Sequence, residues 1–384
     1  MQRAVLFAAL AMLLAGCGAT SATPYASPGK AASPHHHFTW IDMLSPTSGW
    51  ALGSDRTTVY RTRNGLRWQA VPPIADVPQG GYGSVLYAVS PSEAWYAFAA
   101  NASAVALYHT VDGGRRWTHQ TIPFAPARQG YNPLGGPVSM SFANREDGWL
   151  MVAQSHGMST KPGALYRTVD GGKTWRAVAS TGPVPVVVPT LPFNGDVSFT
   201  GPQDGWLVGS ETTTSPSMLY RTTDGGAHWT RVSFPVPGGL PAAEATVVAG
   251  PKFSGRRGAM AVQFLGTGQS FLYESGGGGA TWESTRGQRS LRGNSPLVDL
   301  VSVVPQILAF TYSPDGLDVS RVYGNTWTDG GVIPASDLKA GGQVAEIDFV
   351  NRSDGWAIIT HPFDAAALPV VLRTEDGGKT WIRG

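Results

Sequence analysis

After Phe38 the chain alternates between apolar and polar residues in short segments that are separated by Gly, Asp, Asn and Pro. In the stretch VSFTGPQDGWLVGS, a first strand precedes a turn at Pro202 to Gly205, and a second strand begins at Trp206. The next segments read as a third strand, MLYRTT, a turn, DGGA, and a fourth strand, HWTRVSF. Alternation with a period of two between such turns predicts consecutive antiparallel hairpins.

This four-strand pattern recurs along the chain and is marked by a phrase that is complete in LYRTVDGGKTW, residues 165–175. Seven whole or altered copies of the phrase, spaced 45 to 58 residues apart, end at Trp68, Trp117, Trp175, Trp229, Trp282, Trp327 and Trp381. A second phrase, of the type DGWLVG, lies upstream in five units and supplies Trp50, Trp95, Trp149, Trp206 and Trp356.

Such a repeat predicts how the sheets are arranged. A four-stranded sheet cannot bury both of its faces alone, whereas seven sheets packed face to face in a ring can do so. We therefore predict an all-β fold, a seven-bladed β-propeller of four-stranded antiparallel blades over residues 38–384. Because the first unit begins with its first strand and the last ends on its fourth, we expect the ring to close without a blade shared between the termini.

The repeated phrase has a turn chemistry of its own. Its last glycine is present in all seven copies, which indicates a backbone position with positive φ. Two residues earlier, a short carboxylate can accept hydrogen bonds from the amides of the turn. Four copies carry that carboxylate, at Asp112, Asp170, Asp224 and Asp376; Asn64 replaces it in the first copy, and Gly277 and Val322 stand in its place in two others. A catalytic group would not be repeated around the ring and then lost from two copies, so this carboxylate is expected to be structural.

The phrase TxDGGxTW resembles the Asp-box, or BNR repeat, of sialidases, sortilin-type receptors and xyloglucanases. With the DGWLVG strand before it, the unit looks most like the repeat of the photosystem II assembly factor family called Ycf48 or Hcf136, and of the bacterial exported proteins that carry that domain. The resemblance covers residues 38–384 and implies a propeller. It implies no particular ligand, because the repeat residues are scaffold in every member.

The similarity to sialidases raises the question of catalysis. It implies three arginines on a substrate carboxylate, a Tyr–Glu pair and an acid/base aspartate, but the Arg-Ile-Pro tripeptide that usually carries the first arginine is absent. The chain also has no GxSxG, HExxH or phosphate-cradling loop. Four arginines occupy equivalent third-strand positions and are expected to belong to the scaffold: Arg61, Arg167, Arg221 and Arg373.

One pair of acids keeps a catalytic alternative open. Glu346 and Asp348 are two residues apart on one predicted strand, so they share a face, and two suitably spaced carboxylates can hydrolyse a glycoside. The favoured interpretation is a hydrogen bond in the channel or to a neighbouring blade. We therefore predict a non-catalytic protein- or glycan-binding or assembly module, with a glycoside hydrolase of sialidase-like architecture as the alternative.

The N-terminal residues have the pattern of a targeting segment. Arg3 precedes an apolar stretch from Ala4 to Leu14, which is too short to cross a bilayer as a helix. Leu14-Ala15-Gly16-Cys17 resembles the lipobox of bacterial lipoproteins, and Cys17 is the only cysteine of the chain. We predict a signal peptide at 1–16, a lipid-anchored flexible linker at 17–37, and an extracytoplasmic protein attached to the bacterial cell membrane through Cys17.

Candidate binding residues lie in the long connections, which should gather on the face opposite the repeated turns. Aromatic anchors and an arginine cluster in these connections are candidates for contact with a partner: Tyr82, Phe124, Tyr131 and Phe193, with Arg286, Arg289 and Arg292. We expect no cofactor and no metal site, since His35 to His37 read as part of a polar linker. A formal net charge of +2 gives no case for nucleic acid.

Overall fold

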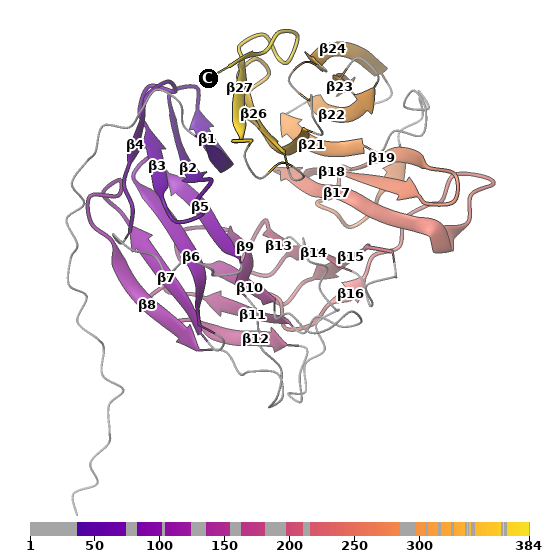
Figure 1. The fold of residues 1–384 in the computed structure, drawn as a ribbon. Coiled ribbons are helices and arrows are strands. Elements are labelled where there is room, and N and C mark those ends of the chain that lie inside the picture. The colour runs from indigo at the N-terminus through magenta and orange to yellow at the C-terminus, as the bar shows by residue number, and fades with distance from the viewer. Residues whose placement is uncertain are drawn as a thin grey trace, which may run out of the picture.

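The computed structural model describes residues 37–73, 83–101, 104–123, 136–153, 163–180, 197–209, 216–284, 297–303, 306–313, 316–323, 326–334, 336, 338, 342–361, 364 and 367–383. Its strands form seven four-stranded antiparallel sheets, and each sheet consists of four consecutive strands. Figure 1 shows these sheets as blades around a central axis, with the chain passing from one blade to the next. The seven-bladed β-propeller predicted from the sequence is confirmed.

The first four blades occupy the N-terminal part of the ring. The first blade has β1 (Phe38–Ser45), β2 (Ser48–Gly53), β3 (Val59–Thr62) and β4 (Trp68–Ala70). The second has β5 (Ser84–Ser90), β6 (Glu93–Asn101), β7 (Ala104–Thr110) and β8 (Thr118–Pro123). The third has β9 (Gly136–Phe142), β10 (Gly148–Ala153), β11 (Gly163–Thr168) and β12 (Arg176–Ser180). The fourth has β13 (Val197–Phe199), β14 (Gly205–Gly209), β15 (Met218–Thr222) and β16 (Thr230–Arg231).

The remaining blades complete the ring. A turn of 3-10 helix, η1 (Ala242–Glu244), leads into the fifth blade, which has β17 (Ala245–Ser254), β18 (Arg257–Phe264), β19 (Gln269–Ser275) and β20 (Glu283–Ser284). The sixth has β21 (Leu297–Val303), β22 (Gln306–Ser313), β23 (Gly316–Tyr323) and β24 (Thr326–Pro334). The seventh has β25 (Gln343–Phe349), β26 (Gly355–Thr360), β27 (Val370–Thr374) and β28 (Ile382–Arg383).

The first strand of each blade lies innermost, and the ring closes through these strands. β1 contacts β5, β5 contacts β9, and β9 contacts β13, while β17 contacts β21 and β21 contacts β25. β25 contacts β1, so the last blade packs directly against the first. Every blade is complete without a strand from another part of the chain, as the sequence predicted.

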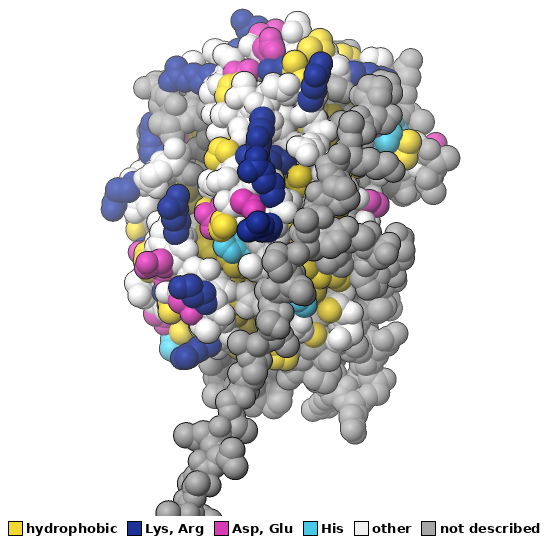
Figure 2. Space-filling view, turned by 90° about the vertical axis from the view of Figure 1, so that its left-hand side faces the viewer, with side chains coloured by type: hydrophobic (Ala, Val, Ile, Leu, Met, Phe, Trp, Pro, Cys, Tyr) yellow, Lys and Arg dark blue, Asp and Glu magenta, His cyan; other side chains and the backbone are white. Residues whose placement is uncertain are grey.

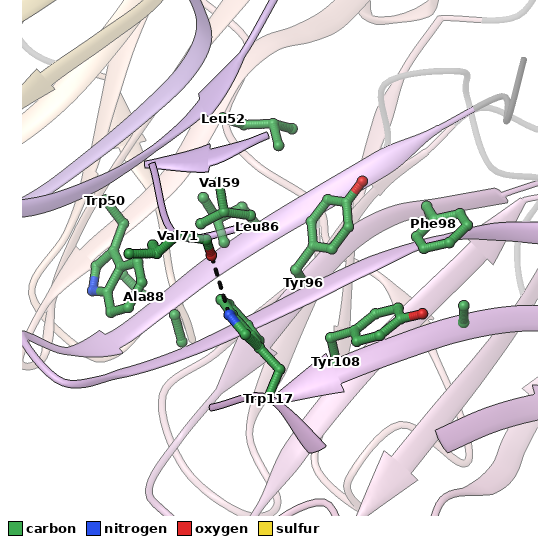
Figure 3. Close-up of a cluster of buried hydrophobic side chains, with 12 residues drawn as sticks. Trp50, Leu52, Val59, Val71, Leu86, Ala88, Tyr96, Phe98, Tyr108 and Trp117 are labelled. Atoms are coloured by element: carbon green, nitrogen blue, oxygen red, sulfur yellow. Dashed lines mark hydrogen bonds between the residues drawn. The ribbon is translucent and has the colours of Figure 1, made fainter. Parts of the chain in front are cut away.

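The hydrophobic core is divided among the interfaces between blades. Buried side chains of the described residues form seven clusters, and each cluster lies between two neighbouring blades. Figure 3 shows the cluster between the first and second blades, which includes Trp50, Leu86 and Trp117. The second-strand tryptophans are the most buried, with 0–2% of their surface exposed: Trp50, Trp95, Trp149, Trp206 and Trp356. Burial of such large rings stabilises each interface through the hydrophobic effect.

The antiparallel strand order gives the ring two different faces. The connections between first and second strands and between third and fourth strands, such as residues 46–47 and 63–67, lie on one face, called here the turn face. The connections between second and third strands and between blades, such as residues 54–58 and 232–244, lie on the opposite face, called here the loop face.

Candidate functional site

The repeated turn satisfies its polar groups internally, as its third copy illustrates. Thr168 Oγ1 accepts a hydrogen bond from the N–H of Gly172 and donates one to Asp170 Oδ1, both at 2.8 Å. Asp170 also accepts bonds from the Thr174 N–H at 2.9 Å and the Thr174 hydroxyl at 2.6 Å. The bond from that hydroxyl contributes most to lowering the pKa of Asp170 to about 2. The carboxylate is therefore committed to holding the turn.

The other copies keep this arrangement with different side chains. Asp112, Asp224 and Asp376 each accept a hydrogen bond from a backbone N–H four residues later. Asn64 does the same work in the first copy, where its Oδ1 accepts bonds from Leu66 and Arg67. In the fifth copy Gly277 replaces the aspartate, and Ser275 holds the turn through a bond from Gly279 at 2.9 Å. The Thr or Ser that precedes the turn, such as Thr168 or Ser275, is thus a second determinant of the turn.

The last glycine of the phrase has the positive φ that the sequence predicted in each of the six described copies. In two copies its lack of a side chain also admits a tryptophan from the preceding blade. A Cβ on Gly172 would overlap the ring of Trp95, and a Cβ on Gly279 would overlap the ring of Trp206. The two repeated phrases therefore meet across these two blade interfaces.

The indoles that end the phrase pack at the same interfaces. Trp229 and Trp381 donate their Nε1–H to the carbonyls of Gly226 and Gly378 in their own turns, both at 3.0 Å. Trp117 donates to the carbonyl of Val71 in the preceding blade at 3.1 Å. Trp175 lies edge-on to Trp95 of the preceding blade, with ring centroids 6.1 Å apart. These contacts place the tryptophans in the scaffold.

The third-strand arginines also belong to the interfaces. Arg167 lies opposite Trp149 in the sheet, and its guanidinium carbon is 5.1 Å from the centre of the indole ring. The same guanidinium forms an ion pair with Asp147 at 2.9 Å. Equivalent stacking joins Arg61 to Trp50, Arg221 to Trp206 and Arg373 to Trp356. A cation over an indole adds to the stability of each of these sheets. Each arginine is held on its own blade, so the four do not converge on one point as the arginines of a sialidase would.

In the five blades that have a second-strand tryptophan, the innermost strand carries a polar residue opposite it. These residues, called here the belt, are Asp42, Tyr87, Ser141, Ser198 and Asp348. Asp348 of the seventh blade accepts a hydrogen bond from the Met43 N–H of the first at 2.6 Å. Tyr87 of the second blade donates to the Phe142 carbonyl of the third at 3.3 Å, and Ser141 of the third accepts from Phe199 of the fourth at 3.0 Å. The belt thus bonds the seventh blade to the first, the second to the third, and the third to the fourth.

Asp42 occupies the belt position of the first blade. Burial, followed by the negative charge of Asp348, raises its pKa to about 7. A hydrogen bond from the backbone of Ala88 and the positive charge of Lys252 oppose this shift. Asp42 and Asp348 therefore act as neighbouring acids whose geometry is set by backbone contacts between blades. For the pair Glu346 and Asp348, the sequence favoured a hydrogen bond in the channel or to a neighbouring blade. Asp348 makes such a bond to the first blade.

The residues proposed from the sequence for partner binding lie outside the described residues. They are Tyr82, Phe124, Tyr131, Phe193, Arg286, Arg289 and Arg292, together with the lipidation candidate Cys17. Described residues on either side of them place the ends of these connections on the loop face. Within the described part of the chain, no cluster of three or more His, Cys, Asp or Glu residues is placed to hold a metal ion. No described helix is long and apolar enough to cross a membrane.

Comparison with known proteins places the fold among solved propellers. No family model matches the chain, and no curated protein matches it significantly. An oligogalacturonate lyase from Vibrio parahaemolyticus is similar with a TM-score of 0.53 and 9% identity, over 89% of this chain and 90% of that one. A PL25 ulvan lyase has a TM-score of 0.50 and 11% identity, over 77% and 80%. A structure described as YCF48 bound to D1 peptide has a TM-score of 0.47 and 16% identity, over 81% and 86%. At these identities the likeness concerns the fold alone.

Proposed function

We propose that this chain is a lipid-anchored extracytoplasmic propeller whose repeated turns are Asp-boxes, and that it acts as a non-catalytic binding or assembly module for a protein or a glycan. The ring is the rigid frame, and the loop face carries the partner. Cys17 supplies the attachment to the bacterial cell membrane.

The observation that carries this proposal is the contrast between the two faces. On the turn face, the aspartates and threonines of the repeated phrase are held in hydrogen bonds within their own turns. The described ends of the non-repetitive connections lie on the loop face, and the proposal assigns their aromatic and arginine residues to partner binding there. Irregular segments presented by a rigid scaffold are where proteins of many folds bind partners.

The start of the described chain supports the same orientation. The carbonyl of His37 accepts a hydrogen bond from the Ser54 N–H at 2.8 Å. The imidazole Nδ1 of His37 bonds the Pro369 carbonyl at 2.8 Å. Both partners lie in connections between second and third strands, so the chain enters the propeller at the loop face. If the proposed linker from Cys17 to His37 behaves as a random coil, its root-mean-square reach would be about 25 Å. A lipid on Cys17 would therefore keep the loop face close to the membrane and to partners embedded in it.

A binding experiment with matched charge variants tests the proposal. The full chain is isolated from membranes after cross-linking, and its partners are compared with those of Arg286→Gln/Arg289→Gln/Arg292→Gln. The control, Arg145→Gln/Lys173→Gln/Arg352→Gln, removes three charges from the turn face. We expect the loop-face variant to lose its cross-linked partner and the control to keep it. Equal recovery from both variants would contradict a partner on the loop face.

Assay of the same preparations with fluorogenic glycosides tests the catalytic alternative. We expect no turnover above that of buffer. Turnover that a single acid substitution abolishes, with Asp348→Asn as the first variant, would instead support a glycoside hydrolase. Because Asp348 bonds the neighbouring blade, Glu346→Gln is the companion variant on the same strand.

A further inference from the structure

A small pocket lies between the first and second blades, at the outer edge of the turn face. Its volume is about 160 Å³, which is room for roughly five water molecules. It is lined by Arg63, Gln69, Ala70 and Val71 of the first blade and by the segment Gly113 to Arg115 of the second. Figure 2 looks at this side of the ring and shows a run of Lys and Arg side chains in the middle of the described surface.

The pocket coincides with a break in the charge pairing of the repeat. In three blades an acid directly before the second strand's Gly-Trp pair neutralises the third-strand arginine. The ion pairs are Asp147 with Arg167 at 2.9 Å, Asp204 with Arg221 at 2.8 Å, and Asp354 with Arg373 at 3.9 Å. In the second blade Glu93 stands at the acid's position and bonds the His109 ring at 3.1 Å, and burial lowers the pKa of that histidine. In the fifth blade the signs are reversed: Arg257 stands before Gly258, and Glu274 has the third-strand position, where burial raises its pKa and the charge of Arg257 opposes that shift.

The first blade alone among these has a neutral residue at the acid's position. Ser48 precedes Gly49 and Trp50 there, and in the described part of the chain Arg61 has no ion pair with a carboxylate. Its Nη1 instead donates to the Gly113 carbonyl at 3.4 Å, on the turn that lines the pocket. Burial, and then the charges of Arg63 and Arg115, lower the pKa of Arg61. Three guanidinium groups thus repel one another at this interface.

Asp112, the carboxylate among the described residues whose charge acts on Arg61, is already engaged. Asp112 Oδ1 accepts hydrogen bonds from the Thr110 hydroxyl at 3.1 Å and from the Arg116 N–H at 2.9 Å. Its charge stabilises Arg61 only in part, being the last and smallest of the influences on that residue's pKa. The pocket therefore has a positive potential that the protein itself leaves uncompensated.

The base of the pocket is rigid. Val71, which lines it, packs in the buried cluster shown in Figure 3, and its carbonyl accepts the hydrogen bond from Trp117 Nε1. A Cβ on Gly114 would overlap the Val71 side chain, so the turn of the second blade lies directly on this residue. The backbone segments that carry Arg63 and Arg115 are consequently fixed on opposite sides of the gap, while the two side chains are exposed and lose rotamer freedom when a ligand joins them.

We propose that this pocket binds the phosphate group of a soluble or glycan-borne phosphate monoester, with Arg63 and Arg115 as its direct ligands. Arg61 is a positioning residue that acts through the Gly113 carbonyl. A phosphate monoester brings nearly two negative charges and three terminal oxygens, which suit two guanidinium forks better than the single charge of a carboxylate. The organic part of the ligand remains outside, because the pocket holds little more than the phosphate.

The test measures phosphate binding to the full chain carrying Cys17→Ser, so that no acyl chain contributes. Inorganic phosphate is titrated by calorimetry, with acetate as the competing carboxylate. We expect saturable phosphate binding that Arg63→Gln/Arg115→Gln weakens by at least about tenfold, since charge-assisted bonds are lost. The control Arg145→Gln/Lys173→Gln removes two exposed charges from the third blade on the same face and should leave the affinity unchanged.

A third variant adds charge instead of removing it. Ser48→Asp supplies the acid that the first blade lacks, so it should pair with Arg61 and weaken phosphate binding while every arginine remains. Thermal unfolding of all variants confirms that each is folded. The proposal is overturned by an absence of saturable binding, by equal weakening in the control, or by acetate binding as tightly as phosphate. Binding to phosphatidic acid vesicles, whose headgroup is a phosphate monoester, without binding to free phosphate would overturn the soluble source and assign a lipid headgroup.

Discussion

The N–H of Met43 in the first blade donates a hydrogen bond to Oδ2 of Asp348 in the seventh, although the two residues are 305 positions apart. They lie on β1 and β25, the inner strands that meet where the ring closes. Around them, Phe38, Ile41 and Ala51 pack against Trp356 and Ile358 of the last blade. Since no strand crosses this seam, closure depends on these side-chain contacts.

We expect Asp348→Ala to lower the free energy of unfolding by roughly 1–3 kcal/mol, because the Met43 N–H loses its acceptor. Urea unfolding measures the change. The experiment should be done near pH 5, where the raised pKa keeps Asp42 protonated and uncharged. At that pH Asp42 does not repel Asp348, so the substitution relieves no repulsion that would offset the loss of the hydrogen bond. Glu146→Ala, at an exposed position on the turn face, is the matched control. Equal effects of the two substitutions would show that the seam bond contributes nothing specific.

The stability of the ring should depend on the protonation of Asp42. Its pKa is raised from 3.8 to about 7 by burial and by Asp348, against the bond from Ala88 and the charge of Lys252. Between these two values the folded state holds a proton that the unfolded chain has released. The stabilisation is therefore complete below pH 3.8 and is lost as the pH rises toward 7.

Urea unfolding at a series of pH values tests this prediction. The free energy of unfolding should fall by about 4 kcal/mol across that window in the unmodified chain, and Asp42→Asn should flatten the fall. Three turn aspartates titrate in a separate pH window, because their pKa values are lowered to about 2: Asp170, Asp224 and Asp376. The stability that they contribute is lost only as the pH drops from 3.8 toward 2. An unchanged slope in the Asp42→Asn chain between pH 3.8 and 7 would count against the assignment.

The fold was predictable because the features that define a blade are local in the sequence. A turn glycine and the tryptophan near it recur at a visible spacing, and so do the strands between them. The belt on the inner strands was not predictable, because Asp42, Tyr87 and Ser141 perform one role with three different chemistries. Only the register, which sets each opposite a second-strand tryptophan, makes them equivalent.

The phosphate pocket escaped prediction for a similar reason. Arg63 and Arg115 belong to different copies of the phrase and meet only because neighbouring blades pack together. A signal was nevertheless present: Ser48 stands where Asp147 and Asp204 stand in other units, and a missing acid beside a retained arginine indicates an unbalanced charge. The candidate binding residues of the loop face were chosen because their segments do not repeat. That criterion identifies a surface, but it does not predict how the side chains are arranged on it.

Attachment through Cys17 is tested by fractionation. Cys17→Ser removes the thiol that would carry the lipid, so we expect the protein to move from the membrane fraction to the soluble fraction. Because two or three acyl chains hold a protein far more firmly than one, the shift should be nearly complete. Gly18→Ser, which leaves the thiol in place, is the control. Retention of the Cys17→Ser protein on membranes would require another mode of attachment.

The packing of each turn against the preceding blade predicts a large difference between two glycines of the repeat. Gly172 has a φ of +79°, and a Cβ there would overlap the buried ring of Trp95, whereas a Cβ on Gly201 meets nothing within 4 Å. Gly172→Ala combines a left-handed backbone with overpacking, so it should cost at least about 2 kcal/mol. Gly201→Ala should change stability by less than about 0.5 kcal/mol. Urea unfolding compares the two, and the quenching of indole fluorescence in the folded state should change only in Gly172→Ala. Similar stabilities would mean that the turn is free to move away from Trp95, and that the interface between the second and third blades is less rigid than its contacts indicate.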